Sequence, residues 1–507
     1  MSSDQSSKSL GSVVGTGMIW MLIAALATKV ASFVSQIVLG NILIQEDFGI
    51  YALAAGVTVF VSVIRDGGAR KVLVQKGVRR FDKLVCPVFW MALCFNLFTA
   101  GLLILAGPVA ARIYDEPALA KLLMVISLGI ATSTPGMIYR SKLAAELRYR
   151  ELARFRTITE IARNLSLVCF ALYGFGAMSF AWPFLVISLV EWVVGFWLCG
   201  PLRLFRSPRF RLWPKLFGMS YWMLVAAVAL AVVNMGPYAI VGYFVPGAVL
   251  GVYYFASQLV LQINNIIAVN LQDVLLPALS SMNSSRSRQG AAVVRTVQML
   301  AFISSFAAFG VASTASEIEW LFWGDKWVAA IPAIQWMCVF IPFRMLQSIL
   351  EPAVLSQSNY KLNAQLMILQ GTVIAVVAFV AGMYFSEPWQ FAALVGGAYA
   401  LSIMVAGAVG CKKLGVDWWG CVRGFAPSWA VGLACFLAVF WAKSMVATDT
   451  TSRVQIFAVL MSSGTVFVFL FAVACRVLLA HVLVDVISVL PQRVRGLAHK
   501  LTLLPSP

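Results

Sequence analysis

The sequence predicts an all-α polytopic membrane protein, because its composition, its long apolar stretches and its distribution of positive charge all favour that fold class. Hydrophobic residues make up 61% of the 507 residues, charged residues only 11%, and the mean hydropathy is +0.88. Soluble domains contain roughly 25% charged residues. A water-soluble globular fold therefore does not fit this composition.

About fourteen apolar stretches are long enough to cross a bilayer as helices, since a spanning helix needs about 20 residues. The first six are residues 18–39, 48–64, 84–111, 118–138, 157–178 and 180–199. A basic connector separates them from eight more, at residues 216–241, 247–271, 293–314, 328–355, 362–385, 389–410, 418–445 and 454–479. Tryptophans such as Trp389, Trp418 and Trp419 lie near the ends of these stretches, as expected for an interfacial belt.

Positive charge alternates between successive connections. Most of the 38 Lys and Arg residues fall in one set of connections, with clusters in residues 65–83, 140–156 and 203–215. The other set is mostly acidic, for example at residues 46–47 and 115–116. The positive-inside rule then places the basic loops and both termini in the cytoplasm, which requires an even number of helices. The net charge of +18 follows from this orientation, so nucleic-acid binding is not predicted.

A short internal repeat indicates two halves of equal orientation. Residues 48–51 read F-G-I-Y at the start of the second stretch, and residues 250–253 read L-G-V-Y in the first turn of the eighth. The two motifs are six helices apart, and six is even, as in transporters with parallel repeats. A chance match near a membrane interface is the alternative.

If the repeat holds, the chain has six parts. These are a cytoplasmic tail (1–16), an N-lobe of six helices (17–200), a basic cytoplasmic connector (201–215), a C-lobe of six helices (216–411), two further helices (412–480) and a basic cytoplasmic tail (481–507).

Metal and hydrolytic sites are not predicted. The nine cysteines form no C-x-x-C pair, and the two histidines, His481 and His499, both lie near the C-terminus. The predicted outer loops are short and contain no nucleophile with an acid–base partner. We therefore expect neither a metal nor a cofactor, and a transporter rather than an enzyme.

Short motifs resemble oligosaccharide flippases of the polysaccharide transporter family. Residues 65–68 (R-D-G-G) with residues 73–75 (L-V-Q) look like the signature that follows the second helix in that family. Residues 148–153 (R-Y-R-E-L-A) resemble its basic loop after the fourth helix, and the F-G-I-Y and L-G-V-Y pair fits its half-repeats. One departure is Arg70-Lys71, where small or uncharged residues are expected in the signature.

The resemblance implies a fold and a function. The fold is that of the multidrug, oligosaccharidyl-lipid and polysaccharide exporter superfamily, with two six-helix lobes and two extra helices. The function is transfer of polyprenyl-pyrophosphate-linked oligosaccharide from the cytoplasmic to the periplasmic leaflet of the bacterial inner membrane by alternating access. Its partners would be this lipid-linked substrate, membrane lipids, and the polymerase and chain-length machinery. Arg65, Arg70 and Lys71 would lie at the cytoplasmic entrance.

Six charged residues lie inside predicted spans. The cations are Lys29, Arg163 and Arg344, and the acids are Glu160, Glu191 and Glu351. A charge at the bilayer centre costs ~2.5–3.5 kcal/mol on the insertion scale, so these side chains must be paired or hydrated. The three cations are our candidates for contacting the anionic head group, and the three acids are candidates for gating or ion pairing.

Two of these pairs have structural alternatives. Glu160 and Arg163 are one helical turn apart and can neutralise each other. Arg344 and Glu351 are seven residues apart, beside Pro342 and Pro352, where a gate or a merely kinked packing helix is expected.

An uncharged polar row is predicted on one face of the eighth helix. Gln258, Gln262 and Asn265 are spaced i, i+4 and i+7, and Gln272 continues the row. Such amides bind sugar hydroxyls, but they also hold transmembrane helices together.

Two other functions stay open. A cation-coupled multidrug antiporter of the same superfamily would more naturally carry an embedded acid in its first or seventh helix, where this chain has Lys29 and Asn234. A polytopic polysaccharide polymerase or ligase would need a catalytic outer loop, and those drawn here reach only about a dozen residues.

Overall fold

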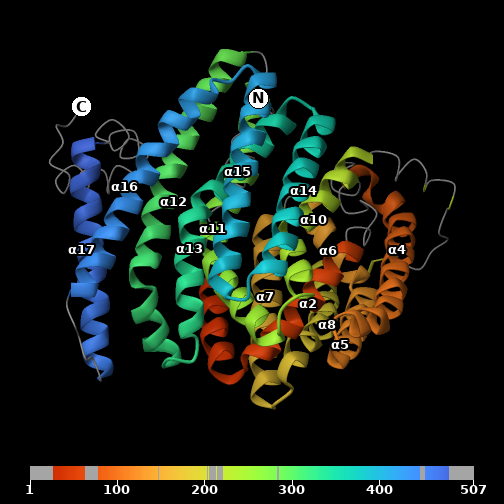
Figure 1. Cartoon of the computed structure of the whole chain (residues 1–507). Coiled ribbons are helices and arrows are strands. Elements are labelled where there is room, and N and C mark those ends of the chain that lie inside the picture. The colour runs from red at the N-terminus through yellow and green to blue at the C-terminus, as the bar shows by residue number, and fades with distance from the viewer. Residues whose placement is uncertain are drawn as a thin grey trace. The chain divides into compact units, whose positions relative to one another are not determined.

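The computed structural model describes residues 27–62, 78–146, 148–202, 221–282, 285–445 and 452–478, with residues 204, 210 and 213. The regular elements of these residues are all helices (Figure 1). Both predicted tails, most of the basic connector, and the entrance candidates Arg65, Arg70 and Lys71 lie outside the described residues.

The chain forms two compact units, Met1–Gly251 and Val252–Pro507. The N-terminal unit starts its described part with helical residues 27–42. Its further elements are α2 (Gln45–Ser62), α4 (Val78–Ile113), α5 (Pro117–Thr132), α6 (Thr134–Ala145), α7 (Tyr149–Leu172), η1 (Gly176–Phe180), α8 (Trp182–Cys199) and α10 (Tyr221–Val241).

The long helix α11 (Gly247–Ser281) begins in the N-terminal unit and continues into the C-terminal one. The other elements of the C-terminal unit are α12 (Arg286–Trp323), η3 (Val328–Ala330), α13 (Ile331–Ser356), α14 (Tyr360–Tyr384), α15 (Pro388–Leu414), α16 (Trp418–Met445) and α17 (Arg453–Leu478). Phe255 of α11 stacks on the fully buried Trp327 with ring centroids 3.9 Å apart, which fixes the turn after α12.

A helix lies in each of the predicted apolar stretches, and α16 has the predicted bounds, although α7 ends at Leu172, six residues before the predicted end. Nine helices of the described part are long and apolar enough to cross a membrane, or ten if the bent pair α5–α6 is one span. The protein is therefore a multi-pass membrane protein. The count of fourteen spans and the cytoplasmic location of both ends stay predictions.

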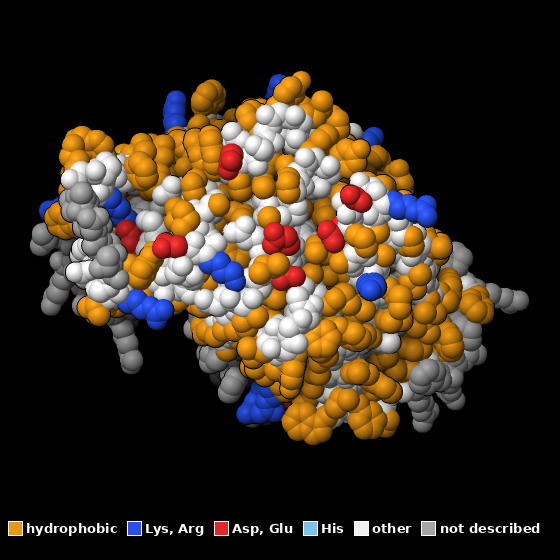
Figure 2. Space-filling model, turned by 60° about the horizontal axis from the view of Figure 1, so that its bottom comes forward, with side chains coloured by type: hydrophobic (Ala, Val, Ile, Leu, Met, Phe, Trp, Pro, Cys, Tyr) orange, Lys and Arg blue, Asp and Glu red, His pale blue; other side chains and the backbone are white. Residues whose placement is uncertain are grey.

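Large apolar side chains also cover the outside of the helices. Leu105, Trp197 and Val454 are 72%, 73% and 80% exposed. Figure 2 shows the same property on one face, where hydrophobic side chains surround scattered acidic and basic ones. A surface of this kind is stable in lipid, where helices satisfy their own backbone hydrogen bonds.

The predicted basic loop after the fourth span is mostly helical. The span breaks at Ser133, and α6 continues at an angle of 46° to α5 as far as Ala145. Pro135 explains the break, because proline has no backbone N–H to donate and disfavours a preceding helical turn. After a short connection α7 begins at Tyr149, eight residues before the predicted start.

The glycines of the two repeat motifs, Gly49 and Gly251, lie in close backbone contacts within the N-terminal unit. A Cβ atom at Gly49 would lie 2.0 Å from the carbonyl oxygen of Gly247, and one at Gly251 would lie 1.8 Å from that of Gln45. The backbones of α2 and of the first turn of α11 thus touch directly. Only glycine fits at both positions without a backbone shift.

Candidate functional site

The N-terminal unit brings three of the six embedded charges together. On α7, Arg163 donates from Nε and Nη2 to Oε2 of Glu160, at 2.9 and 2.7 Å. Both side chains stay accessible, at 41% exposed for Arg163 and 42% for Glu160. The two charges are therefore paired but are not enclosed by packing.

Lys29 of the first described helix lies within electrostatic range of both Glu160 and Arg163. Beside them, Nδ2 of Asn164 donates to Oγ of Ser32 at 3.4 Å and so links α7 to that helix. We call Lys29, Glu160 and Arg163 the cationic cluster. Two positive charges lie near one carboxylate, so the cluster carries one net positive charge. Because of its charged residues, α7 is not among the nine described helices that are apolar enough to cross a membrane, and its place in the membrane stays a prediction.

An aromatic wall lies next to this cluster. Tyr51 of α2 is within electrostatic range of Arg163 and stacks on Phe180 of η1, with ring centroids 4.3 Å apart. Tyr51 was not predicted as a site residue, although its place in the F-G-I-Y motif was a signal. The cluster and this wall together suit an anionic group with an apolar neighbour.

Glu191 takes part in a different and more enclosed contact. Its carboxylate on α8 accepts Nη2 of Arg140 from α6 at 3.4 Å, and its side chain is only 11% exposed. A Cβ at Gly136 would lie 2.5 Å from Glu191 Oε2, so this glycine makes room for the acid. The contact holds α6 against α8, and Arg140 belongs to a helix rather than to the predicted loop.

Two more cations of the predicted basic loop bind the C-terminal end of α8. Lys142 Nζ donates to the carbonyl oxygen of Cys199 at 3.4 Å, and Arg148 Nη2 donates to that of Leu198 at 3.2 Å. Carbonyls at a helix C-terminus lack partners within the helix and favour nearby cations. These two residues therefore have a structural role in addition to any role in topology.

In the C-terminal unit, Arg344 and Glu351 of α13 contact different neighbours. The Arg344 guanidinium lies 4.8 Å from the ring centroid of Tyr399 on α15. Glu351 Oε2 accepts Nε2 of Gln272 at 3.0 Å, so the last amide of the predicted row joins α11 to α13.

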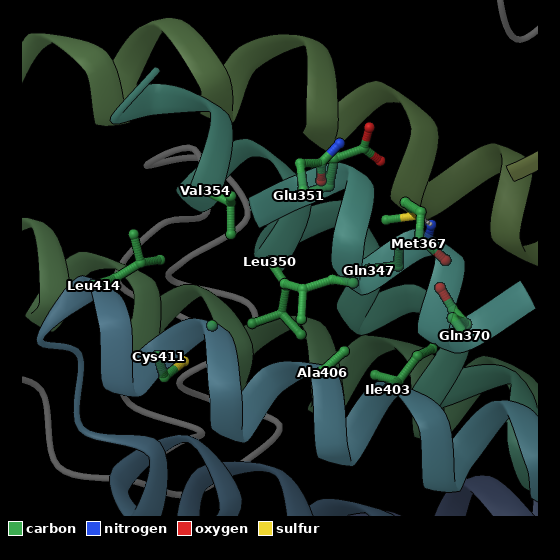
Figure 3. Close-up of a pocket in the computed structure, with 13 residues that line it drawn as sticks. Gln347, Leu350, Glu351, Val354, Met367, Gln370, Ile403, Ala406, Cys411 and Leu414 are labelled. Carbon is green, nitrogen blue, oxygen red and sulfur yellow. Dashed lines mark hydrogen bonds between the residues drawn. The ribbon is translucent and has the colours of Figure 1, made fainter. Parts of the chain in front are cut away.

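A small, mostly apolar pocket with a few polar side chains lies beside Glu351, between α13, α14 and α15 (Figure 3). Gln347, Asn363 and Gln370 also line it. Gln370 is 2% exposed, and its Nε2 has no hydrogen-bond partner within the described part of the chain. The pocket has a volume of about 30 Å³, which is room for ordered water but not for a sugar.

These three amides were not predicted from the sequence. Gln347 precedes Glu351 by one turn, and Asn363 and Gln370 are seven residues apart on α14, so helical spacing was an available signal.

Gln258, Gln262 and Asn265 lie on one face of α11 and are half-buried. Among the residues that the structure describes, their amides have no hydrogen-bond partner in the protein. An amide row of this kind can exchange hydrogen bonds with water or with a hydroxyl-rich ligand.

A metal centre does not appear in the described part of the chain, where no group of three His, Cys, Asp or Glu side chains has suitable geometry. His481 and His499 lie outside the described residues.

Comparison with known sequences gives a family match over more than half of the chain. The model of a family described as "Polysaccharide biosynthesis protein" matches residues 38–332. The succinoglycan biosynthesis transport protein ExoT of Rhizobium meliloti is 26% identical over 321 residues. That alignment covers 62% of this chain and 63% of ExoT, so the chain spans a little under two thirds of this relative.

Comparison with solved structures identifies the fold. The lipid II flippase MurJ in an inward closed conformation matches with a TM-score of 0.68 and 13% identity, over 91% of this chain and 100% of MurJ. An inward-facing multidrug resistance MATE family transporter of the MOP superfamily matches with a TM-score of 0.55 and 13% identity, over 78% of this chain and 94% of the transporter. The chain thus has a helical fold similar to those of MurJ and this MATE transporter, as the resemblance implied, whereas the arrangement in two six-helix lobes with two extra helices stays a prediction.

Proposed function

Because this chain belongs to the polysaccharide biosynthesis protein family, we propose that it is a flippase for lipid-linked oligosaccharides. Its substrate would be a polyprenyl-pyrophosphate-linked repeat unit of an exopolysaccharide, capsule or O-antigen, carried across the bacterial inner membrane. The name of ExoT as a transport protein and the flippase fold of MurJ support this assignment. Fourteen spans with both ends in the cytoplasm, arranged as two six-helix lobes and two extra helices, belong to the same proposal.

The cationic cluster is the observation that carries the proposal. An accessible positive charge within membrane-spanning helices is costly and usually marks a substrate path. A pyrophosphate is a strong acceptor, and Lys and Arg bind phosphate through charge-assisted hydrogen bonds. Lys29 and Arg163 would contact the pyrophosphate, while Glu160 holds Arg163 in place and limits the net charge.

The C-terminal unit would contact the substrate through Arg344 and through the amides of Gln258, Gln262 and Asn265. These amides lack protein partners in the described part of the chain and can replace the water that sugar hydroxyls lose. Glu191 and Glu351, by contrast, already accept hydrogen bonds or ion pairs that join helices. Arg65, Arg70 and Lys71 remain candidates for the cytoplasmic entrance.

The membrane potential supports the direction of export. A pyrophosphate diester carries two negative charges, and an inside-negative potential favours outward movement of each by ~2.3 kcal/mol per 100 mV. This driving force acts if the cations of the protein do not cross the membrane with the substrate. Export that is unchanged when the potential is collapsed would contradict this part of the proposal.

A multidrug antiporter is the second candidate, because a MATE transporter shares the fold. Embedded acids would suit a coupling cation and a cationic drug, whereas the first described helix places Lys29 in the candidate site. The positive charge of the cluster therefore favours an anionic substrate.

The deciding experiment measures which leaflet holds the polyprenyl-linked oligosaccharide in cells. The cells contain the wild-type protein, no protein, or the variant Lys29→Ala or Arg344→Ala. The matched control is Arg288→Ala, because Arg288 is exposed and lies before the apolar part of α12. We expect accumulation on the cytoplasmic leaflet without the protein and with the first two variants, and normal distribution with Arg288→Ala. If the leaflet distribution of the oligosaccharide is unchanged without the protein, while drug sensitivity or polymer length is altered, the result would support the antiporter or a polymerase.

A further inference from the structure

An open pocket of about 670 Å³ lies along the first turns of α16, away from the cationic cluster in sequence and in chemistry. Its lining residues are Asp417, Trp419, Val422, Arg423, Ala426 and Pro427. This volume is in the usual range for a small-molecule or head-group site.

The pocket contains two opposite charges that do not neutralise each other. Asp417 and Arg423 are both exposed, and neither forms an ion pair or side-chain hydrogen bond within the described part of the chain. Asp417 precedes α16, yet its carboxylate accepts no backbone N–H of the first helical turn among the described residues. The carboxylate lies against the first turn of α16, since a Cβ at Gly420 would lie 2.7 Å from Asp417 Oδ2, but it makes no capping hydrogen bond among the described residues.

Trp419 provides an aromatic face beside Asp417. Its side chain is 68% exposed, whereas the neighbouring Trp418 packs against α15, where a Cβ at Gly407 would lie 2.4 Å from its ring. The buried tryptophan anchors the start of α16, and the exposed one is left for another partner. An exposed indole next to a carboxylate is a suitable setting for an ammonium group.

The rest of the pocket is apolar and leads along the helix. Val422, Ala426 and Pro427 follow Trp419 on one face of α16, and the distance along the axis from Asp417 to Pro427 is about 15 Å. The charged end lies at the turn after α15, whose last turn carries Lys412 and Lys413. This turn follows the twelfth of the predicted spans, so the alternation of basic connections predicts that it lies at the cytoplasmic membrane surface, where lipid head groups are found.

We propose that this pocket binds a zwitterionic phospholipid with a primary ammonium, namely phosphatidylethanolamine. Arg423 contacts the phosphate, and Asp417 and Trp419 contact the ammonium. The first part of an acyl chain lies along Val422, Ala426 and Pro427. The pocket shares no lining residue with the proposed substrate contacts, so the inference does not depend on which substrate is flipped.

The charges of the pocket favour this lipid over two other phosphate-containing lipids. Phosphatidylglycerol has no ammonium for Asp417, and a polyprenyl pyrophosphate would bring two negative charges next to that carboxylate. The pocket lining also has no further polar side chain for a sugar. Opposite charges in one accessible pocket match the ammonium and phosphate of one head group.

The test is retention of lipid by the full chain in detergent, measured by native mass spectrometry with equal amounts of phosphatidylethanolamine and phosphatidylglycerol. The wild type should retain more phosphatidylethanolamine, by about fivefold, which is the upper range for one exposed ion pair. Asp417→Asn should remove this preference, and Arg423→Gln should lower retention of both lipids.

Matched variants separate a specific site from a general charge effect. Asp325→Asn and Arg288→Gln change exposed charges elsewhere in the C-terminal unit and should leave the preference intact. Asp417→Glu keeps the carboxylate and should keep the preference, while thermal unfolding without added lipid reports whether each variant is folded. Equal retention of the two lipids by the wild type, or identical behaviour of Asp417→Asn and Asp325→Asn, would overturn the proposal.

Discussion

Two ion pairs, one in each unit, differ in how completely the protein encloses them. In the C-terminal unit, Lys443 Nζ of α16 lies 2.6 Å from Glu317 Oε1 of α12, and these side chains are 24% and 10% exposed. Lys443 also donates to the carbonyl oxygen of Ser313, and Ser316 Oγ donates to Glu317 at 3.0 Å. In the N-terminal unit, the pair of Arg163 and Glu160 is about 40% exposed and has Lys29 nearby.

The difference separates a structural pair from a candidate binding site. The Glu317–Lys443 pair has hydrogen bonds beyond its own contact and links two helices, so its charges have little to offer a ligand. The cationic cluster has an extra cation and accessible side chains. An ion pair of the same chemical type can thus be structural or can bind a ligand, depending on how many of its polar groups already have partners within the protein.

Removing one partner of the enclosed pair should have the largest effect. Lys443→Ala leaves Glu317 charged and poorly accessible, and loss of one partner of a buried pair costs ~3–5 kcal/mol of folding stability. Thermal unfolding of the purified protein in detergent would measure the loss. Transport per folded molecule should stay normal, and a variant as stable as the wild type would contradict the structural role.

The Arg140–Glu191 pair has intermediate exposure and should give an intermediate loss of stability. Its side chains are 30% and 11% exposed, and Arg140→Ala leaves Glu191 without this partner. We expect a loss of about 1–3 kcal/mol in the same unfolding experiment, the range for a polar group left unsatisfied. A loss of stability as large as that of Lys443→Ala would show that side-chain exposure does not predict how much each pair contributes to folding stability.

Within the cationic cluster, transport should fall while stability is retained. Lys29→Ala should reduce the rate of oligosaccharide flipping by about tenfold, equal to ~1.4 kcal/mol, because it removes the extra positive charge. Lys29→Arg is the matched variant and should keep most of the activity. Loss of stability in Lys29→Ala with normal flipping per folded molecule would assign the lysine a structural role.

The smallest effect is expected for Glu160→Gln. The Arg163–Glu160 pair is more than a third exposed, and exposed pairs contribute ~0–1 kcal/mol to stability. The glutamine retains a hydrogen-bond acceptor for Arg163 and adds one net positive charge to the cluster. Flipping should therefore remain within about threefold of the wild type, and its complete loss would make the carboxylate itself part of the mechanism.

The sequence predicted the helices well because apolar length alone marks them. The predicted bounds of α16 agree with the structure. Its start was clear in the sequence because Gly415 and Asp417 interrupt the apolar residues between α15 and α16. The bend at Ser133 was missed because apolar residues continue on both sides of the short polar segment at residues 132–135, so the whole stretch was long enough for one span. The helical form of the basic segment was missed because its charges were assigned to topology, although Arg140 pairs with Glu191 across 51 residues.

The candidate site was only partly visible for a related reason. Each embedded charge could be recognised by its place in an apolar stretch, and Glu160 and Arg163 by their helical spacing. That Lys29 approaches them depends on packing between helices more than 130 residues apart, which no local pattern encodes. Gln370 and Asn363 were missed because their i, i+7 spacing on α14 is shared by many uncharged polar residues in spans, and only packing against α13 shows that they lie beside Glu351.

The contact between Gly49 and the first turn of α11 also has a consequence for biogenesis. Gly49 packs on Gly247, which leaves the ribosome about 200 residues later. At ~5–20 residues per second, this delay is about 10–40 s. During that time the start of α2 is in the membrane without its final neighbour, and its bare backbone surface must be covered by lipid or by the insertion machinery.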